Sequence, residues 1–274
     1  MIPAAFEYQR AQTVDEAVSL LRQNGEDAKL LAGGHSLLPL MKLRLAAPAL
    51  LIDIGRLSDL SYVRADGDQV AIGALTRHRD LEISDVLHNH APVLAHVAGQ
   101  VGDPQVRHRG TIGGSIAHGD PASDLPAACL AVGATFTVVG ANGERTIAAT
   151  DFFRGFLETA LAADEVLTEI RMPKLDGAGW SFQKFNRRAQ DWAIVGVVAV
   201  TGAQPGVALV NMGPVPLRAA AVETALAGGA SPAEAATHAA DGLDPPADLN
   251  ASPEYRRHLA QVLVRRALEE AQTP

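Results

Sequence analysis

The sequence KLLAGGHSLLPLM, residues Lys29–Met41, decides the first part of the fold. Its first four residues predict a short strand that ends at the pair Gly33-Gly34, where glycine allows backbone angles that other residues resist. Apolar residues at helical spacing precede this stretch, and a second apolar strand pattern follows it at Leu50–Ile54. We therefore expect a small β-α-β unit over residues 1–55.

A second glycine pair lies in the stretch TIGGS, Thr111–Ser115, inside a polar segment, Gly102–Asp124, that predicts a loop. Because glycine has no Cβ, backbone N–H groups beside either pair can approach an anion closely. Ser36, Thr111 and Ser115 add hydroxyl donors. Two such loops suit a diphosphate held from both sides, although a single Gly-Gly is more often a plain turn. Neither pair belongs to a Walker loop or to a Gly-x-Gly-x-x-Gly motif.

Three further features each have two interpretations. The basic run Arg107–Arg109 could offset phosphate charge or lie in solvent. Asp120 and Asp124 could bind ribose hydroxyls, and a helix N-cap is the equal alternative. Trp192 offers a flat apolar surface for a ring system, whereas packing at a domain interface is the more common role of such a residue.

The rest of the chain predicts an α+β protein of two domains. Over residues 56–175, strand and helix patterns predict a larger mixed or antiparallel sheet with helices. The polar segment Lys174–Gly179 marks the expected boundary, so the domains are residues 1–175 and 176–274. The second domain is expected to hold helices and three antiparallel strands: Trp180–Asn186, Ile194–Thr201 and Val207–Met212.

The composition limits the classes of function. The chain has 274 residues and a formal charge of −8, which disfavours nucleic acid or an anionic membrane surface as the main partner. Cys129 is the only cysteine, so the chain forms no internal disulfide and cannot supply the thiolates of an iron–sulfur cluster. The histidines are scattered, and the sequence predicts neither a metal site nor a nucleophile–base pair. Without a signal peptide or an apolar span of about 20 residues, we expect a cytoplasmic protein, free or peripheral to the inner face of the membrane.

Both glycine motifs resemble a known family. Ala32–Ser36 followed by Leu37-Leu38-Pro39 resembles the first FAD motif of the medium subunits of molybdenum hydroxylases. Arg109–Ser115, with Asp120–Pro126 after it, resembles the second. This family includes the carbon monoxide dehydrogenase medium subunit, the nearest resemblance, and the FAD domain of xanthine dehydrogenase. The resemblance extends over almost the whole chain and implies a two-part FAD-binding domain followed by a C-terminal α+β domain.

The resemblance also implies a cofactor site. Lys184 corresponds to a flavin-contacting lysine, and Trp192 stands where carbon monoxide dehydrogenase has a tyrosine beside the isoalloxazine, so an aromatic face is kept and a phenol is lost. No residue is expected to be catalytic. The expected FAD-binding residues are Leu31, Ala32, Gly33, Gly34, His35, Ser36, Leu37, Val101, Thr111, Ile112, Gly113, Gly114, Ser115, Asp120, Asp124, Lys184 and Trp192.

In such a family the chemistry is divided among subunits. The resemblance implies that electrons pass from a molybdenum–pterin large subunit, through a [2Fe–2S] small subunit, to the FAD of this chain, and then to an external acceptor such as NAD, a quinone or a cytochrome. The implied assembly is a dimer of heterotrimers. Two alternatives remain open at this point: a stand-alone flavin-dependent oxidoreductase acting on a small molecule, and a non-catalytic binding or assembly protein.

Overall fold

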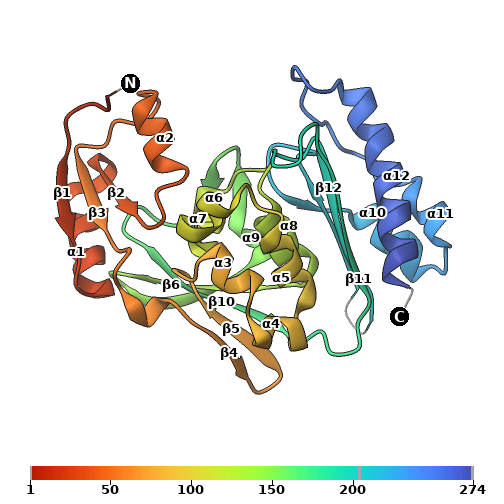
Figure 1. Cartoon of the computed structure of the whole chain (residues 1–274), viewed down its shortest axis with the longest axis horizontal. Helices are drawn as coiled ribbons and strands as arrows, with labels where there is room; N and C mark the ends of the chain where they lie inside the picture. Colours follow the sequence, from red (N-terminus) through yellow and green to blue (C-terminus); the bar gives the residue numbers. More distant parts are fainter. Residues whose placement is uncertain (1, 203–204, 273–274) are drawn as a thin grey trace.

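The computed structural model describes residues 2–202 and 205–272, which form three main sheets in chain order (Figure 1). The first sheet is parallel, with strand order β1-β3-β2, and α1 connects β1 to β2. This confirms the predicted β-α-β unit and adds β1, whose four residues are all exposed and show no alternation. The elements are β1 (Glu7–Arg10), α1 (Val14–Asn24), a 3₁₀ turn (Gly25–Asp27), β2 (Ala28–Leu31), α2 (Leu37–Lys42) and β3 (Leu50–Asp53).

The second sheet has five antiparallel strands in the order β4-β5-β10-β6-β7. Helices cover one face of it and bury a continuous apolar core, in which Phe136 and Phe152 meet edge to face at 4.7 Å between ring centroids. The strands are β4 (Val63–Asp66), β5 (Gln69–Gly73), β6 (Thr135–Gly140), β7 (Gly143–Ala148) and β10 (Val166–Pro173). The remaining elements are a 3₁₀ turn (Ser58–Leu60), α3 (His78–Glu82), α4 (Asp85–His90), α5 (Pro92–Gly99), α8 (Asp124–Ala131), α9 (Ala149–Phe152), and the hairpin β8 (Phe153–Gly155) and β9 (Glu158–Thr159).

The prediction of a loop over Gly102–Asp124 was wrong. This segment contains two short helices, α6 (Pro104–Arg109) and α7 (Ile112–His118). Glycine in a helix interior is unfavourable, so the sequence of α7 predicts no helix. Tertiary contacts reverse that preference. The Thr111 hydroxyl accepts from the Gly114 N–H at 3.1 Å, and a Cβ on Gly113 would come within 2.5 Å of the Ala74 Cβ. Glycine at 113 therefore lets α7 lie directly against the end of β5.

The third sheet is antiparallel, in the order β11-β12-β13-β14. Three of its strands were predicted, and β14 is an additional strand too short to show alternation. Alternate residues of β12 pack on opposite sides: Val198 and Val200 join the core around α8, whereas Val197 and Ala199 join the core around α12. The elements are β11 (Trp180–Phe185), β12 (Val195–Val200), β13 (Gly206–Val210), β14 (Leu217–Arg218), α10 (Ala220–Ala227), α11 (Pro232–Ala236) and α12 (Pro253–Ala271).

Glycine also allows the first sheet and the helices of the second to make close backbone contact. A Cβ on Gly33 would overlap the carbonyl oxygen of Arg109, and the next nearest atoms, both at 3.0 Å, are the carbonyl carbon of Arg109 and the Cα of Gly110. The same Arg109 carbonyl accepts a hydrogen bond from the Arg77 guanidinium. The loop after β2 is therefore pressed against the turn that joins α6 to α7.

We predict that Gly33→Ala destabilises the protein by about 1–3 kcal/mol, the usual cost of forcing an extra methyl into a filled space. Gly228→Ala is the matched control, because its Cβ would meet only two carbonyl oxygens of the preceding helix, at 3.3 and 3.6 Å. Urea unfolding of both variants measures the difference. An equal free energy of unfolding for the two variants would show that the backbone around Gly33 accommodates a methyl group without loss of stability.

Candidate cofactor site

A cleft of about 700 Å³ lies where the three sheets meet. Fifteen of the seventeen predicted site residues line it, all except Ile112 and Asp120. Ile112 is fully buried in the core beneath α7. The Asp120 carboxylate accepts the Ala122 N–H at 2.8 Å, and this residue lines a separate hollow on the far side of Trp192. The fold thus brings together residues as distant in sequence as Leu31 and Trp192.

The first glycine loop offers unpaired backbone donors. Within the described residues, the five consecutive N–H groups from Gly33 to Leu37 donate no hydrogen bond. Gly34 has φ +76°, a conformation that L side chains rarely adopt. Unpaired N–H groups away from water are costly unless a ligand or solvent accepts from them. A run of them around a left-handed residue forms a concave site for an anion.

The second glycine loop is built differently from the prediction. The N–H groups of Ile112 and Gly113 donate to the Thr76 and Ala74 carbonyls, at 3.1 and 2.8 Å. The Gly114 N–H donates to the Thr111 hydroxyl. These backbone donors are already used, so what this loop can offer a ligand is the Ser115 hydroxyl and the bare Cα of Gly114.

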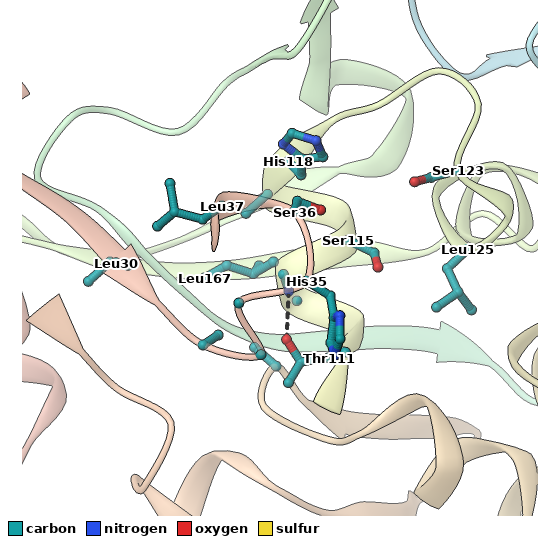
Figure 2. A pocket seen from close by; sticks show the side chains of 18 of the residues that line it. Leu30, His35, Ser36, Leu37, Thr111, Ser115, His118, Ser123, Leu125 and Leu167 are labelled. Carbon is teal, nitrogen blue, oxygen red and sulfur yellow. Dashed lines mark hydrogen bonds between the residues drawn. The ribbon is translucent and has the colours of Figure 1, made fainter. Parts of the chain in front are cut away.

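Figure 2 shows the pocket from close by, with His35, Ser36 and Leu37 on one segment beside Thr111, the N-cap of α7, and Ser115 on that helix. The basic run Arg107–Arg109 does not place its charge in the cleft. The Arg107 guanidinium donates to Glu82 at 3.0 Å and to two backbone carbonyls, and neither Arg107 nor Arg109 lines the cleft. The possible role of this run in offsetting phosphate charge is therefore not supported by the geometry.

A buried ion pair joins α8 to β11 at the floor of the cleft. Lys184 Nζ lies 2.6 Å from Asp124 Oδ2 and 3.0 Å from the Gln100 carbonyl, and both side chains of the pair are almost fully buried. Burial raises the pKa of Asp124 to about 6, against the lowering effect of Lys184. The second oxygen, Oδ1, is buried and has no hydrogen-bond partner among the described residues. A hydroxyl-bearing ligand in the cleft would satisfy it. Ser123, not Asp124, is the N-cap of α8.

Trp192 is half exposed, in the loop between β11 and β12, and it lines both the cleft and the neighbouring hollow. The Trp192 side chain therefore separates the cleft from the hollow, and it forms part of the cleft surface.

Several residues that line the cleft were not among the predicted site residues. His78 belongs to a segment with no glycine motif, and His118 ends α7, three residues beyond the residues that the second glycine motif singled out; burial lowers the pKa of both imidazoles. Apolar residues of α1, β2 and β10, and of the segments that follow β3 and β5, also line the cleft, and they carry only an ordinary core signal: Leu21, Leu30, Ile54, Leu75, Val166 and Leu167.

The fold and the cleft suit a partly anionic cofactor, with an N–H-rich loop on one segment and a hydroxyl-bearing segment facing it. Residues 4–175 match the family described as FAD binding domain in molybdopterin dehydrogenase, and residues 180–271 match the family described as CO dehydrogenase flavoprotein C-terminal domain. The chain therefore belongs to the FAD-binding flavoprotein family of molybdopterin dehydrogenases. Its cofactor is FAD, and it is an oxidoreductase component.

Curated and solved relatives cover the whole chain. The carbon monoxide dehydrogenase medium chain of Hydrogenophaga pseudoflava is 45% identical, over 99% of this chain and 98% of the relative. The glyceraldehyde dehydrogenase medium chain of Sulfolobus acidocaldarius is 37% identical, over 98% and 99%. The solved carbon monoxide dehydrogenase from Hydrogenophaga pseudoflava that lacks the Mo-pyranopterin moiety superposes with a TM-score of 0.96 at 46% identity, covering 99% of this chain and 98% of that one.

We predict that Lys184→Met destabilises the protein by about 3–5 kcal/mol at pH 8, because it leaves a buried carboxylate without a counter-charge. The folded-state pKa of Asp124 already exceeds its usual value and would rise further. Once protonated, the acid costs little, so the penalty should shrink as the pH falls through the raised pKa of the variant and should be largely gone below about pH 6, where the parent carboxyl is protonated as well. Thermal unfolding at pH 5 and pH 8 measures this.

The double variant Lys184→Met/Asp124→Asn is the control and should recover much of the lost stability at pH 8. A loss of equal size at both pH values, without recovery in the double variant, would contradict the assigned ion pair.

Proposed function

We propose that this chain carries FAD as the electron-transfer subunit of a carbon monoxide dehydrogenase-type complex. The observation that carries the proposal is the run of unpaired N–H groups from Gly33 to Leu37, residues that line a cleft of about 700 Å³. These groups would hold the diphosphate, with the Ser115 hydroxyl on the facing segment. When bound, the flavin supplies the redox chemistry, and the protein supplies binding, orientation and electrostatics.

The two ends of the cleft differ in polarity, and this difference indicates which end of the cofactor each would hold. One end is apolar and enclosed by the first sheet and β10, which suits an adenine ring. The other end holds Trp192, Lys184 and the Asp124 carboxylate with its unpaired oxygen, which suits the flavin ring and its ribityl hydroxyls. The isoalloxazine would thus lie near the third sheet, beside an aromatic face.

We also propose the division of labour that the resemblance implied. A [2Fe–2S] small subunit would deliver electrons from a molybdenum–pterin large subunit, and an external acceptor would remove them, in a dimer of heterotrimers. Support comes from relatives named as medium chains that align end to end with this one. Among the described residues, no helix is long and apolar enough to cross a membrane.

Carbon monoxide is the substrate class we favour for the complex, because the relative with that name is more similar than the glyceraldehyde dehydrogenase relative, at 45% against 37% identity. A stand-alone flavin enzyme would require a base near the flavin. Asp191, the carboxylate beside Trp192, accepts from Arg188 at 2.9 Å, and this contact lowers its pKa. A carboxylate held in this way is a poor base.

We predict that Gly114→Val abolishes FAD binding with the fold retained. A Cβ there would meet only the rotatable Thr111 hydroxyl, at 2.7 Å, so the added side chain would extend into the cleft. The visible spectrum after incubation with FAD and desalting, supported by an equilibrium titration, is the measurement. Gly228→Val is the control and should bind FAD as the parent does. Gly33→Val is less informative, since it disturbs the loop packing itself.

A parent chain that takes up no FAD, either alone or assembled with its partner subunits, would contradict the proposed function. Equal FAD uptake by the parent and Gly114→Val would contradict the placement of the cofactor in this cleft.

A further inference from the structure

A buried histidine lies behind the second glycine loop, in contact with the cleft. His78 is 3% exposed and begins α3. Its backbone N–H donates to the Gly110 carbonyl at 3.0 Å, within an antiparallel bridge between Arg77 and Thr111. A Cβ on Gly110 would come within 2.7 Å of the His78 ring, so glycine at 110 leaves room for the imidazole. The backbone at Gly110 therefore packs directly against the ring and restricts its position.

The imidazole makes one side-chain hydrogen bond, from Nε2 to the Ser115 hydroxyl oxygen, at 3.1 Å. Burial lowers the pKa of His78 to about 4, although the Thr111 carbonyl opposes this effect. The ring is therefore neutral near pH 7 and carries one proton, on either Nδ1 or Nε2.

The surroundings of Nδ1 decide between these two forms. Nδ1 is buried and has no hydrogen-bond partner within the described ranges. A buried N–H without an acceptor is rarer in proteins than a buried acceptor without a donor. The proton is therefore assigned to Nε2, which donates to the Ser115 oxygen.

This assignment has a consequence for Ser115. If its oxygen accepts from His78, its own O–H proton must point elsewhere, and within the described residues the hydroxyl donates to no carbonyl of α7. Ser115 lines the cleft on the segment that faces the first glycine loop (Figure 2). The hydroxyl is thus left as a donor toward the space where an anion would lie.

We propose that His78 is a positioning residue that orients the Ser115 hydroxyl to donate to a phosphate oxygen of the bound dinucleotide. The inference rests on the proposed FAD site and extends it to a residue that would not touch the cofactor. Without the Nε2 donor, the hydroxyl could rotate to bond within α7 and would present a lone pair to the phosphate.

The test is a double-mutant cycle on dissociation constants, with FAD and with riboflavin as the probe that lacks phosphate. His78→Phe and Ser115→Ala should each weaken FAD binding about tenfold, as expected for one hydrogen bond to a charged group. The double variant should bind no more weakly than Ser115→Ala, and riboflavin binding should be unchanged. His78→Gln, which keeps an amide donor near the position of Nε2, should restore most of the FAD affinity.

Three outcomes would overturn the inference. His78→Phe could weaken FAD and riboflavin equally, which would indicate a structural role. The effects of the two single variants could multiply in the double variant, which would show that the residues act independently. Nitrogen-15 NMR of the parent could place the proton on Nδ1, and this measurement needs no variant to fold. A parent that binds no FAD would instead refute the proposed function itself, so the two failures are distinguishable.

Discussion

The close contact between the bare Cα of Gly33 and the Arg109 carbonyl is the constraint on which the rest of the site depends. It brings the loop after β2 against the turn before α7, although the two are more than seventy residues apart in the chain. With that side of the loop occupied by protein, the N–H groups from Gly33 to Leu37 are left without partners, and they line the cleft. The glycine pair therefore serves packing first, and the anion site follows from the packing.

The two glycine motifs are similar in sequence but differ in which of their backbone N–H groups are free to bind a ligand. Gly34 has a positive φ and belongs to a loop with open backbone donors. Gly113 lies against Ala74, and the N–H groups around it are already bonded within the protein. One segment thus contributes backbone donors, and the other contributes a side-chain hydroxyl held from behind by a histidine. A third contribution, the ion pair of Lys184 with Asp124, ties the third sheet to this arrangement and leaves a buried oxygen of a cleft-lining carboxylate without a hydrogen-bond partner among the described residues.

Much of the fold and of the candidate site was predicted from the sequence, and the features that the sequence did not predict were missed for physical reasons. Strand β11 alternates and β12 and β13 are almost entirely apolar, so these three strands were predicted within two residues, and fifteen of seventeen predicted site residues line one cleft. The helix α7 was missed because its glycines oppose helix formation until Ala74 and the Thr111 cap stabilise it. Strand β14 depends on its pairing with β13. His78 could not be found, since its importance lies in burial and in a contact across thirty-seven positions.

Hydrogen–deuterium exchange of the cofactor-loaded and cofactor-stripped protein tests the central claim most directly. The amides from Gly33 to Leu37 are unpaired in the structure, so a peptide that contains them should exchange fast without FAD and become strongly protected with it. The peptide that covers Thr111–Ser115 should change much less, because four of its amides, those of Ile112, Gly113, Gly114 and Ser115, are already bonded within the protein. Protection of the second segment without protection of the first would contradict the account, and would move the diphosphate away from the first glycine loop.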